Sequence, residues 1–371
     1  MIFNLDKIRY SIVLLISVTF GFIYAYEDDN YQLKLLNVLF RHGDRTPDDY
    51  ETYPNDPYLN YTYYPIGNGQ LTNDGKLREF RLGEFLRKRY DNYLGSLYIP
   101  KTIEARSSDY DRTKVSLQLV LAGLFPTKNV QIWNDNLLWQ PIPTKYVPRV
   151  YDNLFLTHEC PRFSDELKTI LEYTEIKEEL ASFDDLNIEL SKYTGRNVHN
   201  PIDYGFIYTI LILQKSMGFL LPAWTKSLLP KLYDAALFGP MLKEFIQNIV
   251  GYLNGTIEVD NKLFLYSGHD LNVASLLYSL NICEPHIPEY SSSIFMELLY
   301  KDGIYYVRIL YYLGIPAELK VLRLPNCEEI CPLNTFFQLI IDNLPTDEDM
   351  ICDKRNTSKY VDQKYDYTIK I

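Results

Sequence analysis

A largely apolar segment at residues 35–40 leads directly into the sequence Arg-His-Gly-Asp-Arg-Thr-Pro at residues 41–47. The apolar segment predicts a buried strand, and therefore a sheet at the centre of the fold. This strand delivers Arg41, His42 and Arg45 to one place. Guanidinium groups bind phosphate oxygens in pairs, and a neutral imidazole between them can attack phosphorus. The sequence therefore predicts a phosphate site at the end of this strand.

Runs of strand and helix character alternate along the chain. They are strand-like at 33–40, 263–267, 294–299 and 304–311, and helix-like at 74–91, 109–124 and 270–280. The alternation predicts an α/β fold with a mostly parallel sheet flanked by helices. Residues 151–255 are mainly helix-like, which predicts a helical cap insertion over the carboxyl ends of the strands, where ligands bind in such folds. We expect the α/β core to comprise residues 26–150 and 256–355, followed by a polar tail at residues 356–371.

Two further polar motifs lie downstream. Residues 106–113 read Arg-Ser-Ser-Asp-Tyr-Asp-Arg-Thr, and residues 266–270 read Tyr-Ser-Gly-His-Asp. With the motif at residues 41–47, which matches Arg-His-Gly-x-Arg-x-Pro without a gap, they resemble the motifs of the histidine acid phosphatases. The resemblance covers roughly residues 30–355 and is closest to the animal prostatic, lysosomal and venom acid phosphatases. It implies a phosphoglycerate mutase-like fold and hydrolysis of phosphate monoesters.

The resemblance also implies roles for individual residues. His42 is expected to be the nucleophile that forms a covalent phosphohistidine, and Asp270 the acid that protonates the leaving group. No metal or other cofactor is expected. The expected ligands of the substrate phosphate are Arg41, Arg45, Arg106 and His269.

Cationic neighbours explain how a histidine can act as a nucleophile in an acidic compartment. A free histidine has a pKa of about 6.5, so its ring would be largely protonated there. Arg41, Arg45 and Arg106 should lower the pKa of His42, because they disfavour another positive charge nearby. Acidic conditions keep more of the Asp270 carboxyl protonated, so an acidic pH optimum is expected.

Two other charged residues within these motifs are expected to have supporting roles. Arg112 lies in a predicted helix, where an ion pair with Asp109 or Asp111 is expected. Asp44 lies between two arginines in the sequence and is expected to orient them.

Two alternative functions use the same residues. A metal-dependent phosphoesterase could use His42, Asp44, His269 and Asp270 as ligands, but three nearby arginines would repel a divalent cation. A non-catalytic secreted protein that binds phosphate esters would keep the pocket without turnover. Sensitivity to a chelator distinguishes the first alternative, and an absence of turnover distinguishes the second.

The N-terminal segment is typical of a secretory signal peptide. Lys7 and Arg9 precede an apolar run at residues 11–23 and a small residue at Ala25, so residues 1–25 are expected to be removed. The apolar run is short for a membrane span. We expect a soluble, secreted protein with no membrane partner, and the lysosomal lumen is the second choice.

Secretion is consistent with the cysteines and the glycosylation sequons. The spacing of Cys327 and Cys331 allows a local disulfide. The family resemblance suggests a second disulfide between Cys160 and Cys352, which leaves Cys283 over. Sequons begin at Asn60, Asn254 and Asn356.

The net charge of −11 argues against nucleic acid as a partner, because an acidic protein repels it. It does not argue against a small phosphomonoester substrate, since the local field of the arginines outweighs distant, screened charges. The resemblance allows a homodimer. Lys145 departs from the family pattern, because close relatives carry a histidine there, and this departure bears on substrate preference and on the dimer contact.

Overall fold

The computed structural model describes residues 30–345 except for 157–158, 160–164, 166–167, 170–171, 182, 200, 230–240, 259 and 285. Several expectations lie outside the described residues. They are the signal peptide at residues 1–25, the disulfide between Cys160 and Cys352, the sequon at Asn356 and the polar tail at residues 356–371.

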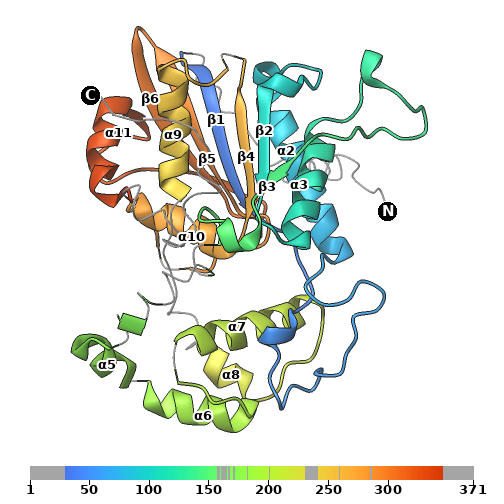
Figure 1. Ribbon diagram of the computed structural model, residues 1–371, viewed down its shortest axis with the longest axis vertical. Coiled ribbons are helices and arrows are strands. Elements are labelled where there is room, and N and C mark those ends of the chain that lie inside the picture. Colours follow the sequence, from blue (N-terminus) through green and yellow to red (C-terminus); the bar gives the residue numbers. More distant parts are fainter. Residues whose placement is uncertain are drawn as a thin grey trace, which may run out of the picture. The chain divides into compact units, whose positions relative to one another are not determined.

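A mixed sheet forms the centre of the protein (Figure 1). Its strands are β1 (Gln32–Arg41), β2 (Ile103–Ser107), β3 (Lys145–Tyr146), β4 (Leu263–Gly268), β5 (Ser293–Lys301), β6 (Ile304–Tyr312), β7 (Leu319–Leu322) and β8 (Ile330–Pro332). The strand order is β3-β2-β4-β1-β5-β6-β7, and β8 pairs with β6. The pairs among β3, β2, β4 and β1 are parallel, whereas every pair that involves β5, β6, β7 or β8 is antiparallel.

The structure confirms an α/β sheet flanked by helices, but the sheet is parallel on one side only. The expected strands at 294–299 and 304–311 form the hairpin of β5 and β6, in which Lys301 pairs with Ile304. The two residues between them are Asp302 and Gly303, with φ angles of 49° and 84°. An Asp-Gly pair with positive φ favours a tight hairpin turn, and this local signal accounts for the antiparallel half.

Helices lie on both faces of the sheet and also outside its layers. They are α2 (Asn73–Leu94), α3 (Asp111–Leu124), α5 (Thr174–Ala181), α6 (Asp184–Thr194), α7 (Pro201–Ser216), α8 (Thr225–Leu228), α9 (Met241–Leu253), α10 (Asp270–Ser279) and α11 (Leu333–Ile340). Short 3₁₀ helices are η1 (Asp49–Glu51), η2 (Pro100–Thr102), η3 (Asn129–Gln131), η4 (Arg149–Tyr151) and η7 (Ile341–Asn343).

Strand β1 is buried from both sides because successive side chains of a strand point to opposite faces. Leu36, Val38 and Phe40 share a hydrophobic cluster with α2 and α3. Leu35 and Leu39 belong to a second cluster with α9, α10 and α11. Figure 1 shows the two sets of helices on opposite sides of the sheet.

Two glycines allow α2 and α3 to approach closely. A Cβ atom on Gly83 would lie 2.1 Å from the carbonyl oxygen of Val120, and one on Gly123 would lie 2.2 Å from that of Phe80. Any larger side chain would therefore push the helices apart. The contact fixes the position of α3, whose first turn carries Arg112.

The helices α6, α7 and α8 form a separate hydrophobic cluster that includes Tyr53. Gln214 of α7 donates hydrogen bonds to both carboxylate oxygens of Asp56, at 2.9 and 2.8 Å. The segment after the first motif therefore packs with these helices. Helix α9 falls within the expected insertion, but its Phe245 and Ile249 belong to the cluster that contains β1, so α9 packs with the sheet.

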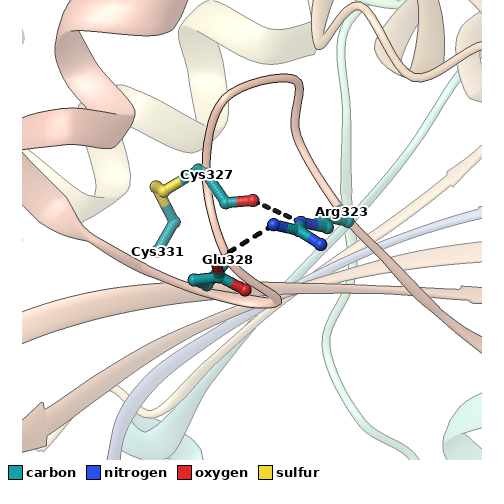
Figure 2. Close-up of a disulfide and its surroundings, with 4 residues drawn as sticks. All are labelled: Arg323, Cys327, Glu328 and Cys331. Atoms are coloured by element: carbon teal, nitrogen blue, oxygen red, sulfur yellow. Dashed lines mark hydrogen bonds and ion pairs between the residues drawn. A yellow bond between two sulfur atoms is a disulfide. The ribbon is translucent and has the colours of Figure 1, made fainter.

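A disulfide joins Cys327 to Cys331, which lies in β8, and confirms the local bridge expected from their spacing. Figure 2 shows Arg323 beside this loop: its Nε donates to the carbonyl oxygen of Cys327 at 2.6 Å, and its Nη2 donates to Oε1 of Glu328 at 3.0 Å. Cys283 is a free thiol.

Within the part of the chain that the structure describes, no helix is both long enough and apolar enough to cross a bilayer. The sequon asparagines Asn60 and Asn254 are exposed, as a glycosylated residue must be.

Candidate active site

The three motifs meet at the carboxyl ends of the parallel strands β1, β2 and β4. Arg41 pairs with Gly268 in the β1–β4 register, and the backbone N–H of His42 donates to the carbonyl oxygen of Gly268 at 3.0 Å. Ser108 follows β2 and donates its backbone N–H to Ser267 at 3.1 Å. Motifs that are far apart in the sequence are therefore adjacent at the edge of the sheet where ligands bind in α/β folds.

The ring of His42 is buried, and its hydrogen bonds define its protonation state. Nδ1 lies 2.8 Å from the carbonyl oxygen of Gly43. Because a carbonyl oxygen only accepts, Nδ1 carries the proton and donates it. Nε2 then has an unshared electron pair, which accepts a hydrogen bond from Nε of Arg112 at 3.2 Å. Nε2 is therefore the nitrogen that can attack phosphorus.

The pKa of His42 is held well below its ordinary value. Burial is the largest cause, because it disfavours the charged ring, and further lowering comes from the charges of Arg112, His269, Arg41 and Arg45. The expected effect of arginines on this pKa is confirmed in direction. Arg112 takes the place that the sequence analysis gives to Arg106.

The guanidinium of Arg41 is buried and held by three neighbours. Nη2 pairs with Oδ2 of Asp270 at 2.8 Å, and Nη1 donates to the carbonyl oxygen of Pro288 at 2.6 Å. Its Cζ lies 4.0 Å from the ring centre of Tyr290. Among the described residues, nothing accepts a hydrogen bond from its buried Nε. Buried donors are normally satisfied, so this N–H is available to an anion.

Arg45 is also buried and is paired with Glu51 of η1. Nη1 donates to Oε2 of Glu51 at 2.8 Å, and Nη2 donates to Oε1 at 2.5 Å. Burial by itself would lower the pKa of Arg45, but Glu51 outweighs burial and raises it. The buried Nε of Arg45 likewise has no acceptor in the described part of the chain. Arg41 and Arg45 thus each have one unpaired N–H, and the charges of both guanidinium groups act on His42.

Arg112 belongs to this group, and the expected ion pair with Asp109 or Asp111 is wrong. Its Nη1 donates to Oδ2 of Asp48 at 3.1 Å, while its Nε donates to the nucleophilic ring. Asp109 pairs instead with Lys114, at 2.5 Å. Side chains in a helix point back toward its N-terminus, so an arginine in the first turn of α3 reaches the strand ends. In the sequence, the feature that points to Arg112 is its position in the motif at residues 106–113.

Arg106 does not join the group. In the β2–β4 register it pairs with Tyr266, on the face that α9 covers. Its neighbour Ser107 points to the opposite face, because side chains alternate along a strand. Nη2 of Arg106 donates to Oδ1 of Asp152 at 3.0 Å. The structure therefore brings Arg112, rather than Arg106, to the expected phosphate site.

Asp44 is expected to orient Arg41 and Arg45, but its carboxylate pairs with Arg78 instead. Its Oδ2 accepts a hydrogen bond from Nε of Arg78 at 2.7 Å. Its carbonyl oxygen accepts the backbone N–H of Thr72, the N-cap of α2, at 2.9 Å. Asp44 thus attaches the first motif to α2.

His269 and Asp270 lie at the turn between β4 and α10. Nε2 of His269 is 2.9 Å from Oγ of Ser108, and the ring centres of His269 and His42 are 5.4 Å apart. The structure therefore places His269 beside the nucleophile, at the end of the neighbouring strand.

The carboxylate of Asp270 is fixed by Arg41 and by the backbone N–H of Leu271, which it accepts at 2.8 Å. Burial acts to raise the pKa of Asp270, but Arg41, followed by the Leu271 N–H and the other arginines, lowers it below its ordinary value. This carboxyl is therefore ionised at mildly acidic pH.

The carboxylates of the metal alternative are engaged by arginines. Asp44 pairs with Arg78, and Asp270 pairs with Arg41. In the described ranges, no group of three or more His, Cys, Asp or Glu side chains is arranged to hold a metal ion. Three arginines around a neutral imidazole suit an anion.

A neutral histidine among arginines, at the carboxyl ends of parallel strands in an α/β fold, is the arrangement of an enzyme that uses a histidine to act on phosphate groups. Residues 32–200 and 233–312 match the histidine phosphatase superfamily (branch 2), and the chain belongs to that family. It is 47% identical over 343 residues to a venom acid phosphatase of Apis mellifera, with 87% of this chain and 88% of the relative covered. It is 32% identical over 358 residues to the prostatic acid phosphatase of Homo sapiens, with 90% and 92% covered.

A solved structure shows the same fold. The phytase of Hafnia alvei in complex with myo-inositol hexakis sulphate superposes with a TM-score of 0.61, over 87% of this chain and 99% of that chain. The two sequences are 16% identical, so this likeness concerns the fold alone.

Proposed function

We propose that this protein, an acid phosphatase of the histidine phosphatase superfamily, hydrolyses small phosphate monoesters through a phosphohistidine at Nε2 of His42. The surroundings of Nε2 carry the proposal: the nitrogen is unprotonated, its pKa is low, and Arg41, Arg45 and Arg112 surround it. A phosphate group would satisfy the unpaired Nε donors of Arg41 and Arg45. Three cations would also stabilise the charge on its oxygens in the transition state.

The first step exchanges one partner of His42 for another. In the structure, Nε of Arg112 donates a hydrogen bond to Nε2. This bond must break, because the same electron pair attacks phosphorus, and the freed N–H of Arg112 can then bind a phosphate oxygen. The attack forms the N–P bond and breaks the bond from phosphorus to the ester oxygen, which leaves with the bonding electrons.

Asp270 supplies the proton that the departing oxygen needs. Arg41 holds the pKa of Asp270 low, but a bound phosphate would share Arg41 and so raise that pKa. A phosphomonoester has a second pKa of about 6, so at mildly acidic pH the substrate brings a proton that Asp270 can take up and pass on. In the second step, ionised Asp270 takes a proton from water, which attacks phosphorus and releases neutral His42.

The deciding experiment measures hydrolysis of p-nitrophenyl phosphate at mildly acidic pH with EDTA present. Wild type should be active, and His42→Ala should lose more than about 10³-fold in kcat. His199→Ala is the control, since this side chain is 66% exposed and pairs with Asp203. Activity lost to EDTA would support the metal alternative, and an inactive wild type would support the phosphate-ester-binding alternative.

We also propose that the protein is secreted, with the lysosomal lumen as the second choice. The N-terminal segment and two exposed sequons support this, as do relatives named venom, prostatic and lysosomal acid phosphatases. Expression in insect cells, with activity measured separately in medium and cell lysate, distinguishes the two destinations. Removal of N-glycans should increase the mobility of the secreted protein. A homodimer stays a prediction, which light scattering tests.

A further inference from the structure

Arg106 forms a largely buried ion pair with Asp152, and its register partner Tyr266 lies on the face of the sheet that α9 covers. The side chain of Arg106 is 19% exposed, that of Asp152 is 0% exposed, and Nη2 lies 3.0 Å from Oδ1. The guanidinium also lies 5.6 Å from the ring centre of Phe155. Because desolvation offsets most of the attraction in a buried pair, such a pair is a weak source of stability. The hydrogen bonds that link this ion pair to the turn between β4 and α10 indicate a role other than stability.

The oxygen of Asp152 that binds Arg106 also organises the following turn. Oδ1 accepts the backbone N–H groups of Leu154 and Phe155, each at 3.2 Å. Burial raises the pKa of Asp152, and Arg106 is the foremost group that opposes this rise. Without Arg106, the carboxyl would favour its neutral form, which is a weaker acceptor for both N–H groups.

The backbone of Phe155 is in turn bonded to α10. Its carbonyl oxygen accepts a hydrogen bond from Nδ2 of Asn272 at 3.0 Å. Its ring lies against Gly268, where an added Cβ would be 3.1 Å from Cδ1 of Phe155. Phe155 therefore contacts both sides of the turn between β4 and α10.

Asn272 completes the connection to the candidate catalytic residues. Its Oδ1 accepts the backbone N–H of His269 at 2.9 Å, while its Nδ2 donates to Phe155. Only one orientation of the amide satisfies both bonds. We propose that Arg106 and Asp152 are positioning residues, which hold His269 and the adjacent proton donor in place through Phe155 and Asn272. The proposal rests on the role of Asp270 in the proposed function.

Displacement of Asp270 can be told apart from general destabilisation, because it should affect substrates with different leaving groups unequally. An alkoxide leaving group, such as that of glycerol 2-phosphate, needs a proton from Asp270. The p-nitrophenolate anion is stable and needs the proton far less. A displacement of about 1 Å in a catalytic group can cost about a hundredfold in rate. Displacing Asp270 should therefore slow glycerol 2-phosphate much more than p-nitrophenyl phosphate.

The test compares kcat/KM for both substrates in the full chain with Arg106→Gln, because kcat/KM reports release of the ester oxygen and not the later hydrolysis of the phosphohistidine, which both substrates share. We expect a loss of about tenfold to a hundredfold on glycerol 2-phosphate, and of less than about threefold on p-nitrophenyl phosphate. Arg106→Lys, which keeps the cation, should recover part of the loss. Arg308→Gln is the matched control, because Arg308 pairs with Glu297 at 2.5 Å and their side chains are 12% and 1% exposed. The control should change kcat/KM by the same factor for both substrates.

Asp270→Asn separates failure of this proposal from failure of the proposed function. If Asp270→Asn lowers kcat/KM equally for both substrates, the proposed role of Asp270 as proton donor is wrong. If Asp270→Asn slows glycerol 2-phosphate more than p-nitrophenyl phosphate, but Arg106→Gln changes both by the same factor as Arg308→Gln does, the positioning role is overturned. Adding Arg106→Gln to Asp270→Asn should cause no further loss on glycerol 2-phosphate, and an additive loss would also overturn it.

A second variant keeps the test decisive if Arg106→Gln does not fold. Asn272→Asp preserves the side-chain shape and leaves the buried ion pair intact, but it replaces the donor that faces the carbonyl oxygen of Phe155 with an oxygen. The same selective loss on glycerol 2-phosphate is expected. Equal losses on both substrates would overturn the proposal.

Discussion

Nε of Arg112 donates a hydrogen bond to Nε2 of His42 at 3.2 Å, while Nδ1 of the same ring is bonded to the carbonyl oxygen of Gly43. The first bond opposes protonation of Nε2, and the second fixes which nitrogen carries the proton. Asp48 holds the other end of Arg112, through Nη1 at 3.1 Å. These contacts thus keep the nucleophile neutral and oriented.

Replacing Arg112 should therefore impair the enzyme most at low pH. In Arg112→Gln the pKa of His42 should rise toward its ordinary value, because one of the charges that lower it is gone. More of the ring is then protonated in acid, so the acidic limb of the kcat/KM profile should move to higher pH. Loss of one stabilising donor should also lower kcat by about 10²-fold to 10³-fold.

Lys114→Ala provides the control for Arg112→Gln. Lys114 lies on the same helix, but its amine pairs with Asp109. Its replacement should leave the pH profile unchanged and kcat within about twofold of wild type. An Arg112→Gln profile with an unmoved acidic limb would contradict the proposed coupling to His42.

The low pKa of His42 should also reduce stability in acid. In the unfolded chain this pKa returns to about 6.5, so below that pH the unfolded state binds a proton that the native state does not. The free energy of unfolding should therefore fall as pH decreases from about 6.5 toward the lower native pKa, by about 1.4 kcal/mol for each pKa unit of lowering.

Urea denaturation of wild type and His42→Gln at neutral and mildly acidic pH measures this contribution. The variant should lose less stability on acidification, because its residue 42 does not titrate. Other buried groups with shifted pKa values, such as Glu79 and Glu244, are common to both proteins and cancel in the difference. If acidification lowered the free energy of unfolding equally in the two proteins, the low pKa of His42 would not contribute to the loss of stability in acid.

Much of the site could be predicted because its residues lie in short motifs at the ends of strands. The apolar run before Arg41 predicts β1, and the turn at His269 follows a second apolar strand, so their convergence follows from parallel pairing. Arg106 and Arg112 could not be placed this way. The alternation of a strand turns Arg106 to the far face, and the direction of helical side chains brings Arg112 back to the site.

The antiparallel half of the sheet depends on a signal of only two residues. Asp302 and Gly303 form the turn that reverses the chain between β5 and β6. Strand-like runs at either side do not by themselves distinguish a hairpin from a parallel crossover. The positions of Asp152 and Asn272 could not be predicted at all, because each binds a group distant in the sequence: Asp152 the side chain of Arg106, and Asn272 the backbone carbonyl of Phe155.

Close packing of α2 on α3 should make Gly83→Ala destabilising. The added Cβ would lie 2.1 Å from the carbonyl oxygen of Val120, which is backbone and cannot rotate away. Overpacking of this kind should cost about 1–3 kcal/mol in the free energy of unfolding. Because α3 carries Arg112, activity should fall as well.

Gly205→Ala is a matched control, since Gly205 also lies within a helix but an added Cβ would have nothing within 4 Å. Alanine has the higher helix propensity, so this variant should be as stable as wild type or more stable by up to about 1 kcal/mol. Urea denaturation of both variants tests the pair. Equal effects would show that the close approach of α2 and α3 is not needed for stability.

The disulfide between Cys327 and Cys331 should contribute to stability without contributing to catalysis. It closes a short loop, so replacing both cysteines by alanine should cost roughly 2 kcal/mol in the free energy of unfolding. Cys331 pairs with Val307 in the middle of β6, whereas Ser293 lies at the end of β5 next to the site. Activity at saturating substrate should therefore stay within about twofold of wild type. The control is Cys283→Ala, which removes only the free thiol and should change neither the free energy of unfolding nor the activity. A double variant that kept its stability but lost activity would show that this loop shapes the site.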